Sequence, residues 1–241
     1  MQSTLLALAD RYSLSRQEIF AELESILSEV LSERYLSEIT CHLRENLQME
    51  IISKKFQNGV IKQHLPHIPK NLNYSKIQAL LEYRLGISSV IKHVRRLKAL
   101  EKTMVWGQIN HKSPDGHIYI ETEIFPAEPL VAICPINRIG IHERHRPHLQ
   151  KGQVRAFHLR HIDPVLLNGL PRIKIVVDRV SKTLTENLLL FHLREKAPQF
   201  QIRCAKRFVG HKSVILAKKP LPKDVIIAVD RELRERIEVH I

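Results

Sequence analysis

The chain has 241 residues, of which 44% are hydrophobic, enough for folded cores and too many for a disordered chain. No apolar run approaches the roughly 18–20 residues that span a bilayer, and the first residues lack the basic start of a signal peptide, so we expect a cytoplasmic protein without membrane contact. The formal net charge of +13 predicts a polyanionic partner. The three cysteines are far apart, which excludes a zinc ribbon and favours a reducing compartment over a disulfide framework.

The charge is distributed unevenly. Residues 1–50 carry a net charge of −5, and the basic excess lies in the rest of the chain. This asymmetry predicts a protein partner for the first segment and a nucleic acid for the remainder. A solvated acidic helix face is an equally good explanation of the first segment.

The clearest local signal predicts a helix over residues 14–31. Ser15 and Glu18 have the spacing of a capping box, and apolar residues then recur at helical spacing from Ile19 to Leu31. A short helix is expected before it, over residues 4–9. The polar face of the main helix is acidic and is a candidate protein-docking face, formed by Glu22, Glu24, Glu29 and Glu33.

Residues 35–62 alternate as strands do, with a turn signal at residues 57–59. Two helices are expected next, the first ending near Gly86 and the second carrying a basic face. A basic helix face is either solvated or in contact with phosphates. The candidate phosphate contacts are Lys92, Arg95 and Arg96.

After residue 103 the hydrophobic period changes from that of a helix to that of a strand. We expect five strands, at residues 103–109, 117–123, 130–134, 153–159 and 172–178. Five short strands with a long insertion between the third and fourth predict a small barrel, for which the OB fold is the natural candidate. OB barrels stack bases on exposed aromatic rings, so His117 and Tyr119 are candidate stacking residues, with burial in the core as the alternative. Trp106 is expected in the core.

The loop at residues 142–148 holds the densest polar cluster. Its His-Glu-x-His spacing is not the His-Glu-x-x-His spacing of a helical zinc site, and Pro147 disfavours a long helix, so we expect no metal there. One hypothesis is a basic loop that contacts RNA phosphates, and the alternative is an exposed loop tip. The candidate RNA contacts are Arg144, Arg146 and Lys151.

The last segment, residues 181–241, predicts the order helix, strand, strand, helix, strand. The first helix is expected to begin at a Thr185 cap, the strands to cover residues 201–208 and 213–218, and the second helix to begin near Pro222. The hairpin between the strands is basic. Its candidate phosphate contacts are Lys206, Arg207 and Lys212.

Several stretches in this order resemble the NusA family of transcription elongation and termination factors. They are LSRQEIFAELESIL with Tyr35, VRRLKALEKTMVWGQI, INRIGIHERHRPHLQKGQVRAFHL and IKIVVDRVSKTLTENLLLF. The resemblance implies an α+β multidomain chain: an RNA-polymerase-binding domain (1–102), an OB barrel of the ribosomal-protein S-one type (103–180) and a KH-like unit (181–241). It also implies RNA polymerase core and nascent RNA as partners of a monomer, and a role in pausing, termination or antitermination.

The chain departs from the family pattern at its end. KH domains grip RNA with a Gly-x-x-Gly loop, and none of the eight glycines here forms one. The KH-like unit is therefore expected to be degenerate, and a second KH domain has no counterpart. The basic net charge also differs from the acidic charge usual in the family.

The sequence favours a binding protein over an enzyme. It contains no Gly-x-Ser-x-Gly, no Walker A and no Gly-x-Gly-x-x-Gly motif, and we expect no cofactor. One alternative is a general RNA- or ribosome-associated protein without polymerase contact. A second is a protein-interaction scaffold whose positive charge is incidental.

Overall fold

The computed structural model describes the chain except for residues 1, 45–48, 58–59, 65–71, 126–127 and 145–147. The chain divides into two compact units, Met1–His93 with Leu166–Arg172, and Val94–Val165 with Ile173–Ile241. Helices and strands are mixed in both units, which confirms the α+β expectation at this level. Among the described residues, no helix has both the length and the apolar content that a membrane crossing requires.

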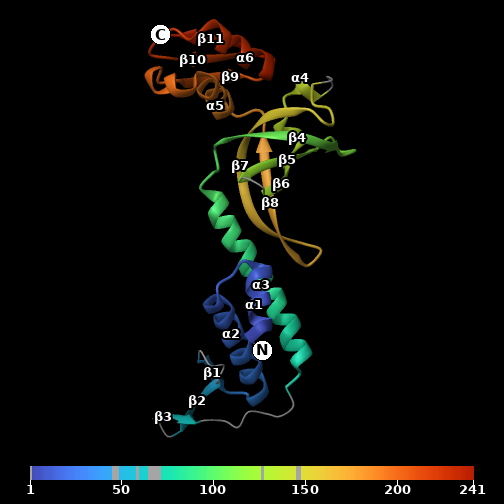
Figure 1. The fold of residues 1–241 in the computed structure, drawn as a ribbon, viewed down its shortest axis with the longest axis vertical. Helices are drawn as coiled ribbons and strands as arrows, with labels where there is room; N and C mark the ends of the chain where they lie inside the picture. Colours follow the sequence, from blue (N-terminus) through green and yellow to red (C-terminus); the bar gives the residue numbers. More distant parts are fainter. Residues whose placement is uncertain (1, 45–48, 58–59, 65–71, 126–127, 145–147) are drawn as a thin grey trace. The chain divides into compact units, whose positions relative to one another are not determined.

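The first unit packs helices beside a small sheet (Figure 1). Its elements are α1 (Gln2–Tyr12), α2 (Arg16–Tyr35), β1 (Glu38–Leu43), β2 (Met49–Gln57), β3 (Val60–His64) and the first part of α3 (Tyr74–Lys98). The sheet is antiparallel in the order β1-β2-β3. The predicted capping box is confirmed, because the Ser15 amide donates to the Glu18 carboxylate at 2.6 Å and the Glu18 amide donates to the Ser15 hydroxyl at 3.2 Å. The predicted turn at residues 57–59 lies partly outside the described residues.

Helix α3 corrects the expectation of two helices separated at Gly86. The helix continues through this glycine to Lys98. A glycine inside a helix costs only about 1 kcal/mol relative to alanine, which the packing of an apolar face outweighs. Leu81 and Leu85, just before Gly86, are both buried in the core of the first unit.

The second unit begins with a closed five-stranded barrel. Its strands are β4 (Met104–Lys112), β5 (Ile118–Phe125), β6 (Glu128–Cys134), β7 (Val154–Leu167) and β8 (Leu170–Asp178), of which the end of β7 and the start of β8, Leu166–Arg172, belong to the first unit. The order around the barrel is β4-β5-β6-β8-β7; β4 pairs antiparallel with β5 and β7, β5 pairs antiparallel with β6, and β6 pairs parallel with β8. All five predicted strands are present, and the barrel interior is apolar, with Ile109, Ile120 and Phe157 almost completely buried.

Strands β7 and β8 are longer than predicted. They extend to a two-residue turn at Asn168 and Gly169, which joins them. Both turn residues have positive φ, 52° and 75°. Positive φ at both central residues is the requirement of the tight hairpin turn that Asn-Gly favours.

The rest of the second unit follows the predicted order of helix, strand, strand, helix, strand (Figure 1). It comprises α5 (Lys182–Leu193), β9 (Arg203–Phe208), β10 (Lys212–Leu216), α6 (Lys223–Leu233) and β11 (Arg236–His240). The sheet order is β11-β10-β9, parallel between β10 and β11 and antiparallel between β9 and β10. Helix α5 is capped by the Ser181 hydroxyl, and the predicted cap Thr185 is instead buried inside the helix.

One apolar core joins the barrel to the C-terminal elements. Ala156 of β7 belongs to the same buried cluster as Leu188 and Val229. Trp106 of β4 is half-buried against this cluster, with its ring centroid 5.6 Å from that of Phe191. The barrel and the C-terminal sheet are therefore packed together as parts of one unit.

Candidate nucleic-acid interface

The acidic residues of α2, predicted as a docking face, are largely engaged inside the first unit. Glu22 accepts a hydrogen bond from the Ser88 hydroxyl at 2.6 Å. Glu29 pairs with Arg84 of α3. Glu24 accepts a hydrogen bond from the Leu43 amide at 2.6 Å. Of the four predicted residues, Glu33 is the one that is exposed and makes none of these contacts to α3 or β1.

Helix α2 holds the edge strand β1 through side chains at every fourth position. The Ser32 hydroxyl accepts from the Ile39 amide at 2.9 Å, and the Ser28 hydroxyl accepts from the Cys41 amide at 2.8 Å. Glu24 continues this row to Leu43. Four helical residues rise about 6 Å and two strand residues about 6.8 Å, so the two spacings match closely enough for three successive bonds. The acidic character of α2 therefore has a structural cause at Glu24.

The basic residues of α3 are at the surface. Lys92 contacts Glu18 at 2.9 Å, while Arg95 and Arg96 are exposed. Hydrogen bonds from Ser15, together with Lys92, lower the pKa of Glu18 to about 2, so this carboxylate stays charged near neutral pH. Arg96 lies 3.7 Å from Glu128 of β6. Lys92 thus has a carboxylate partner, and Arg95 remains the most direct candidate for a phosphate on this helix.

The outer surface of the barrel carries an aromatic stack. The rings of Tyr119 on β5 and His111 on β4 lie 4.5 Å apart and within 7° of parallel. The neighbouring candidate His117 has a different role, because its Nδ1 accepts the Ile136 amide at 3.1 Å and so fixes the residues after β6. His111 is a residue that the sequence did not single out. Strict alternation along β4 from the buried Ile109 would have placed His111 inward; a register shift between Ile109 and His111 instead pairs it with Tyr119 on the outside.

The described residues of the loop at residues 142–148, which are 142–144 and 148, make contacts within the second unit. The loop contains the short helix α4 (Ile141–Arg144). The Arg144 Nε donates to the Ile139 carbonyl at 3.2 Å, and His142 and His148 donate through Nε2 to the carbonyls of Leu233 and Glu232 at 3.0 and 2.9 Å. The predicted contact Arg146 lies outside the described residues. Lys151 is exposed at the following turn and remains available to an anionic ligand.

Arg179 is the centre of a buried ion cluster beneath this loop. Its side chain has 0% exposure and makes a two-pronged contact with Glu143, whose nearest carboxylate oxygen is 2.6 Å from Nη2. Its Nη1 donates to Glu232 at 2.9 Å and to the Ala156 carbonyl at 2.7 Å. Burial disfavours the charged guanidinium, yet the two carboxylates raise the pKa of Arg179 above its ordinary value. This cluster ties α4, the end of β8 and α6 to each other.

His148 lies beside the same cluster. Its Nε2 is 3.6 Å from the Glu143 carboxylate, and the side chain is 4% exposed. Burial and the adjacent Arg179 charge lower the pKa of His148 below its ordinary value. The residue is therefore neutral at physiological pH and serves packing and hydrogen bonding, not phosphate attraction.

A second buried carboxylate organises the start of α5. Asp178 accepts the amides of Val180 and Ser181 at 3.1 and 2.8 Å, and His158 donates to it through Nδ1 at 3.0 Å. Burial alone raises the pKa of Asp178, but these hydrogen bonds outweigh it and hold the pKa below its usual range. The junction between barrel and C-terminal elements is thus built on ionised groups.

The basic hairpin β9–β10 separates into buried and exposed cations. Arg207 has a side-chain exposure of 2% and pairs through Nε and Nη2 with Glu235, at 2.9 Å for each contact. Its third contact is to the Ser181 carbonyl. These contacts engage the guanidinium inside the unit, so Arg207 is not available to contact a phosphate. Lys206 and Lys212 are exposed on the opposite face of the sheet.

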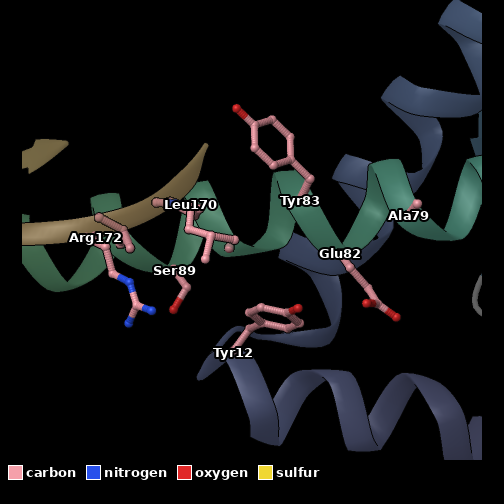
Figure 2. Close-up of a pocket in the computed structure, with 10 residues that line it drawn as sticks. Tyr12, Ala79, Glu82, Tyr83, Ser89, Leu170 and Arg172 are labelled. Atoms are coloured by element: carbon pink, nitrogen blue, oxygen red, sulfur yellow. The ribbon is translucent and has the colours of Figure 1, made fainter. Parts of the chain in front are cut away.

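The first unit also contains a pocket of about 490 Å³ (Figure 2). Tyr12, Glu82, Tyr83, Ser89 and Arg172 are among its lining residues. It offers one carboxylate and one guanidinium and lies beside α3. No group of three or more His, Cys, Asp or Glu side chains suited to a metal ion occurs among the described residues.

The aromatic stack, in which His111 is exposed and Tyr119 half-buried, and the exposed cations are suited to binding, since they supply flat rings and positive charge at a surface. No protein-family model matches the chain, and no curated protein matches it.

Proposed function

We propose that the chain is an RNA-binding transcription factor that docks on RNA polymerase and modulates pausing, termination or antitermination. The observation that carries the RNA-binding part is the topology of the barrel. The order β4-β5-β6-β8-β7, with the first strand paired to the fourth and the third paired in parallel to the fifth, supports the assignment of an OB fold.

The surface chemistry supports the same proposal. OB barrels bind single strands by stacking bases on aromatic rings beside basic groups. The His111–Tyr119 stack lies on the outside of β4 and β5, and the next residue, Lys112, is exposed and donates through Nζ to the Arg144 carbonyl at 2.9 Å. The formal net charge of +13 supplies the long-range attraction that a polyanion requires.

The C-terminal elements fit a degenerate KH-like unit. Their helix-strand-strand-helix-strand order, with the last strand parallel to the middle one, is the order we would expect of a KH arrangement that lacks one helix and the RNA-binding glycine loop. In this proposal the unit braces the barrel through the Arg179 cluster, and KH-type gripping of RNA is absent.

Polymerase docking rests on the resemblance to NusA, and the geometry narrows the surface that would serve it. Because Glu22, Glu24 and Glu29 hold the first unit together, the docking surface on α2 reduces to its C-terminal end. Glu33 is exposed there, and Leu36, the C-cap residue, is 93% exposed. An exposed leucine beside an exposed carboxylate suits a protein surface with an apolar recess and a basic rim.

The test is capture of purified bacterial RNA polymerase core by the full chain and by a Glu33→Lys/Leu36→Asn variant. Asparagine is tolerated at position 36 because the residue adopts a left-handed conformation, φ 49°. We expect the wild-type chain to capture polymerase and the variant to lose most of the capture, while an exposed Lys223→Gln change in the second unit has no effect. RNA binding without polymerase capture would favour a general RNA- or ribosome-associated protein instead.

A further inference from the structure

The C-terminal sheet has one face covered by helices and one face open. The residues that face α5 and α6 are buried, among them Cys204 of β9, Ser213 and Ile215 of β10, and Ile237 of β11. Arg207 lies on this covered side with its partner Glu235. The residues between them in each strand point the other way and are exposed or half-buried.

The strand register arranges the open face as three rows across three strands. The first row is Phe208, Lys212 and Arg236, the second Lys206, Val214 and Glu238, and the third Arg203, Leu216 and His240. Paired residues on neighbouring strands share a face of a sheet, so all nine side chains belong to one surface.

The open face is strongly basic. It carries four Lys or Arg side chains and a single carboxylate, Glu238, which is shared by Lys212 at 2.9 Å and Arg236 at 3.6 Å. Over the part of the chain that the structure describes, neither Arg203 nor Lys206 forms an ion pair. Two cations of this face therefore have no counter-charge among the described residues.

The same face exposes apolar surface. Phe208, the last residue of β9, is 50% exposed, and Leu216, the last residue of β10, is 45% exposed. Phe208 is opposite Lys212 in the register, so an aromatic ring lies directly beside a cation. Protein-binding surfaces usually have an apolar centre with charges at the rim. Here a cation occurs in every row, which fits a partner that presents negative charge along its whole length.

We infer that this open face binds single-stranded RNA, with a base stacked on Phe208 and the phosphates neutralised by Arg203 and Lys206. The inference rests on the proposed RNA-binding function and adds a second site to the barrel. The face measures about 10 by 13 Å from strand spacing and rise. Sheet platforms of RNA-binding domains stack two or three bases. RNA is thus bound by the face of the sheet, in a unit that has no Gly-x-x-Gly loop.

The test is fluorescence-anisotropy titration of the full chain with a labelled oligouridylate over a series of salt concentrations. Loss of base stacking in Phe208→Ala should weaken binding about 5- to 150-fold with little change in salt dependence, and Phe208→Tyr should restore it. Removing one phosphate contact in Lys206→Gln should lower the slope of log affinity against log salt by about 0.7. Lys223→Gln, on the exposed side of α6, removes the same charge and should leave both quantities unchanged.

The outcomes separate this inference from the proposed function. If the wild-type chain binds RNA and both Phe208→Ala and Lys206→Gln bind as it does, the open face is not a site, while the proposed function stands. If the wild-type chain does not bind RNA at all, the proposed function fails with it. Equal or tighter binding of oligodeoxythymidylate, or equally effective competition by polyglutamate, would also overturn RNA as the occupant.

Discussion

Replacement of Arg179 by methionine should destabilise the second unit severely. The substitution removes a guanidinium that has 0% exposure and leaves the carboxylate of Glu143, itself 2% exposed, without its counter-charge. Glu232, which is 11% exposed, loses the same partner. Removing one member of a buried ion pair costs about 3–5 kcal/mol, a large share of the roughly 5–15 kcal/mol by which a typical domain is stable.

Urea unfolding followed by tryptophan fluorescence measures this loss. Trp106 is the only tryptophan and packs against the core of the second unit, so its emission reports that unit alone. The exposed Arg231→Met change on α6 is the matched control and should stay within about 0.5 kcal/mol of wild type.

A double variant tests whether the unpaired carboxylate causes the loss of stability. Arg179→Met combined with Glu143→Leu should be more stable than Arg179→Met alone, because the unpaired buried carboxylate is removed with its partner. A loss below about 1 kcal/mol for Arg179→Met, or a double variant less stable than the single one, would refute the view that an uncompensated buried charge sets the cost.

Three further predictions follow from individual contacts. Because the pKa of His148 is lowered in the folded state, the unfolded chain binds a proton more readily, and the second unit should lose stability as pH falls below about 6.5. In a plot of the urea unfolding midpoint against pH, His148→Gln should flatten this acidic part of the curve. An unchanged curve would contradict the assignment. Ser28→Ala removes the acceptor of the Cys41 amide and should cost the first unit about 1 kcal/mol, with faster hydrogen exchange at that amide; unchanged protection would show that the bond is dispensable. Tyr119→Ala should weaken RNA binding by about 1–3 kcal/mol while Tyr119→Phe binds as wild type, and equal losses in both would exclude stacking.

Local signals explain what could be read from the sequence. The capping box at Ser15 and Glu18 and the period of the barrel strands depend on residues a few positions apart, and the structure contains both. The turn at Asn168 and Gly169 was equally local, and its Asn-Gly dipeptide was a readable hairpin signal that would have extended the last two barrel strands.

Non-local pairing explains what could not be read. Arg179 meets Glu143 across 36 residues and Glu232 across 53, and Arg207 meets Glu235 across 28. A single sequence shows that these residues are charged but not which charges are buried together. Arg207 and Lys206 are neighbours in a basic stretch, yet strand alternation turns one inward and the other outward. The acidic residues of α2 were predicted to form a docking face for the same reason, because their partners on α3 and β1 are set by the tertiary fold and cannot be read from the sequence.

The measurement that tests the central claim most directly is the affinity of the full chain for single-stranded RNA as a function of salt. Contacts with about three to five phosphates predict that log affinity falls linearly with log salt concentration, with a slope of about −2 to −3.5. A linear fall in this range supports an RNA-binding factor whose positive charge is functional. Absence of binding at low salt, or binding that salt does not weaken, would contradict the account.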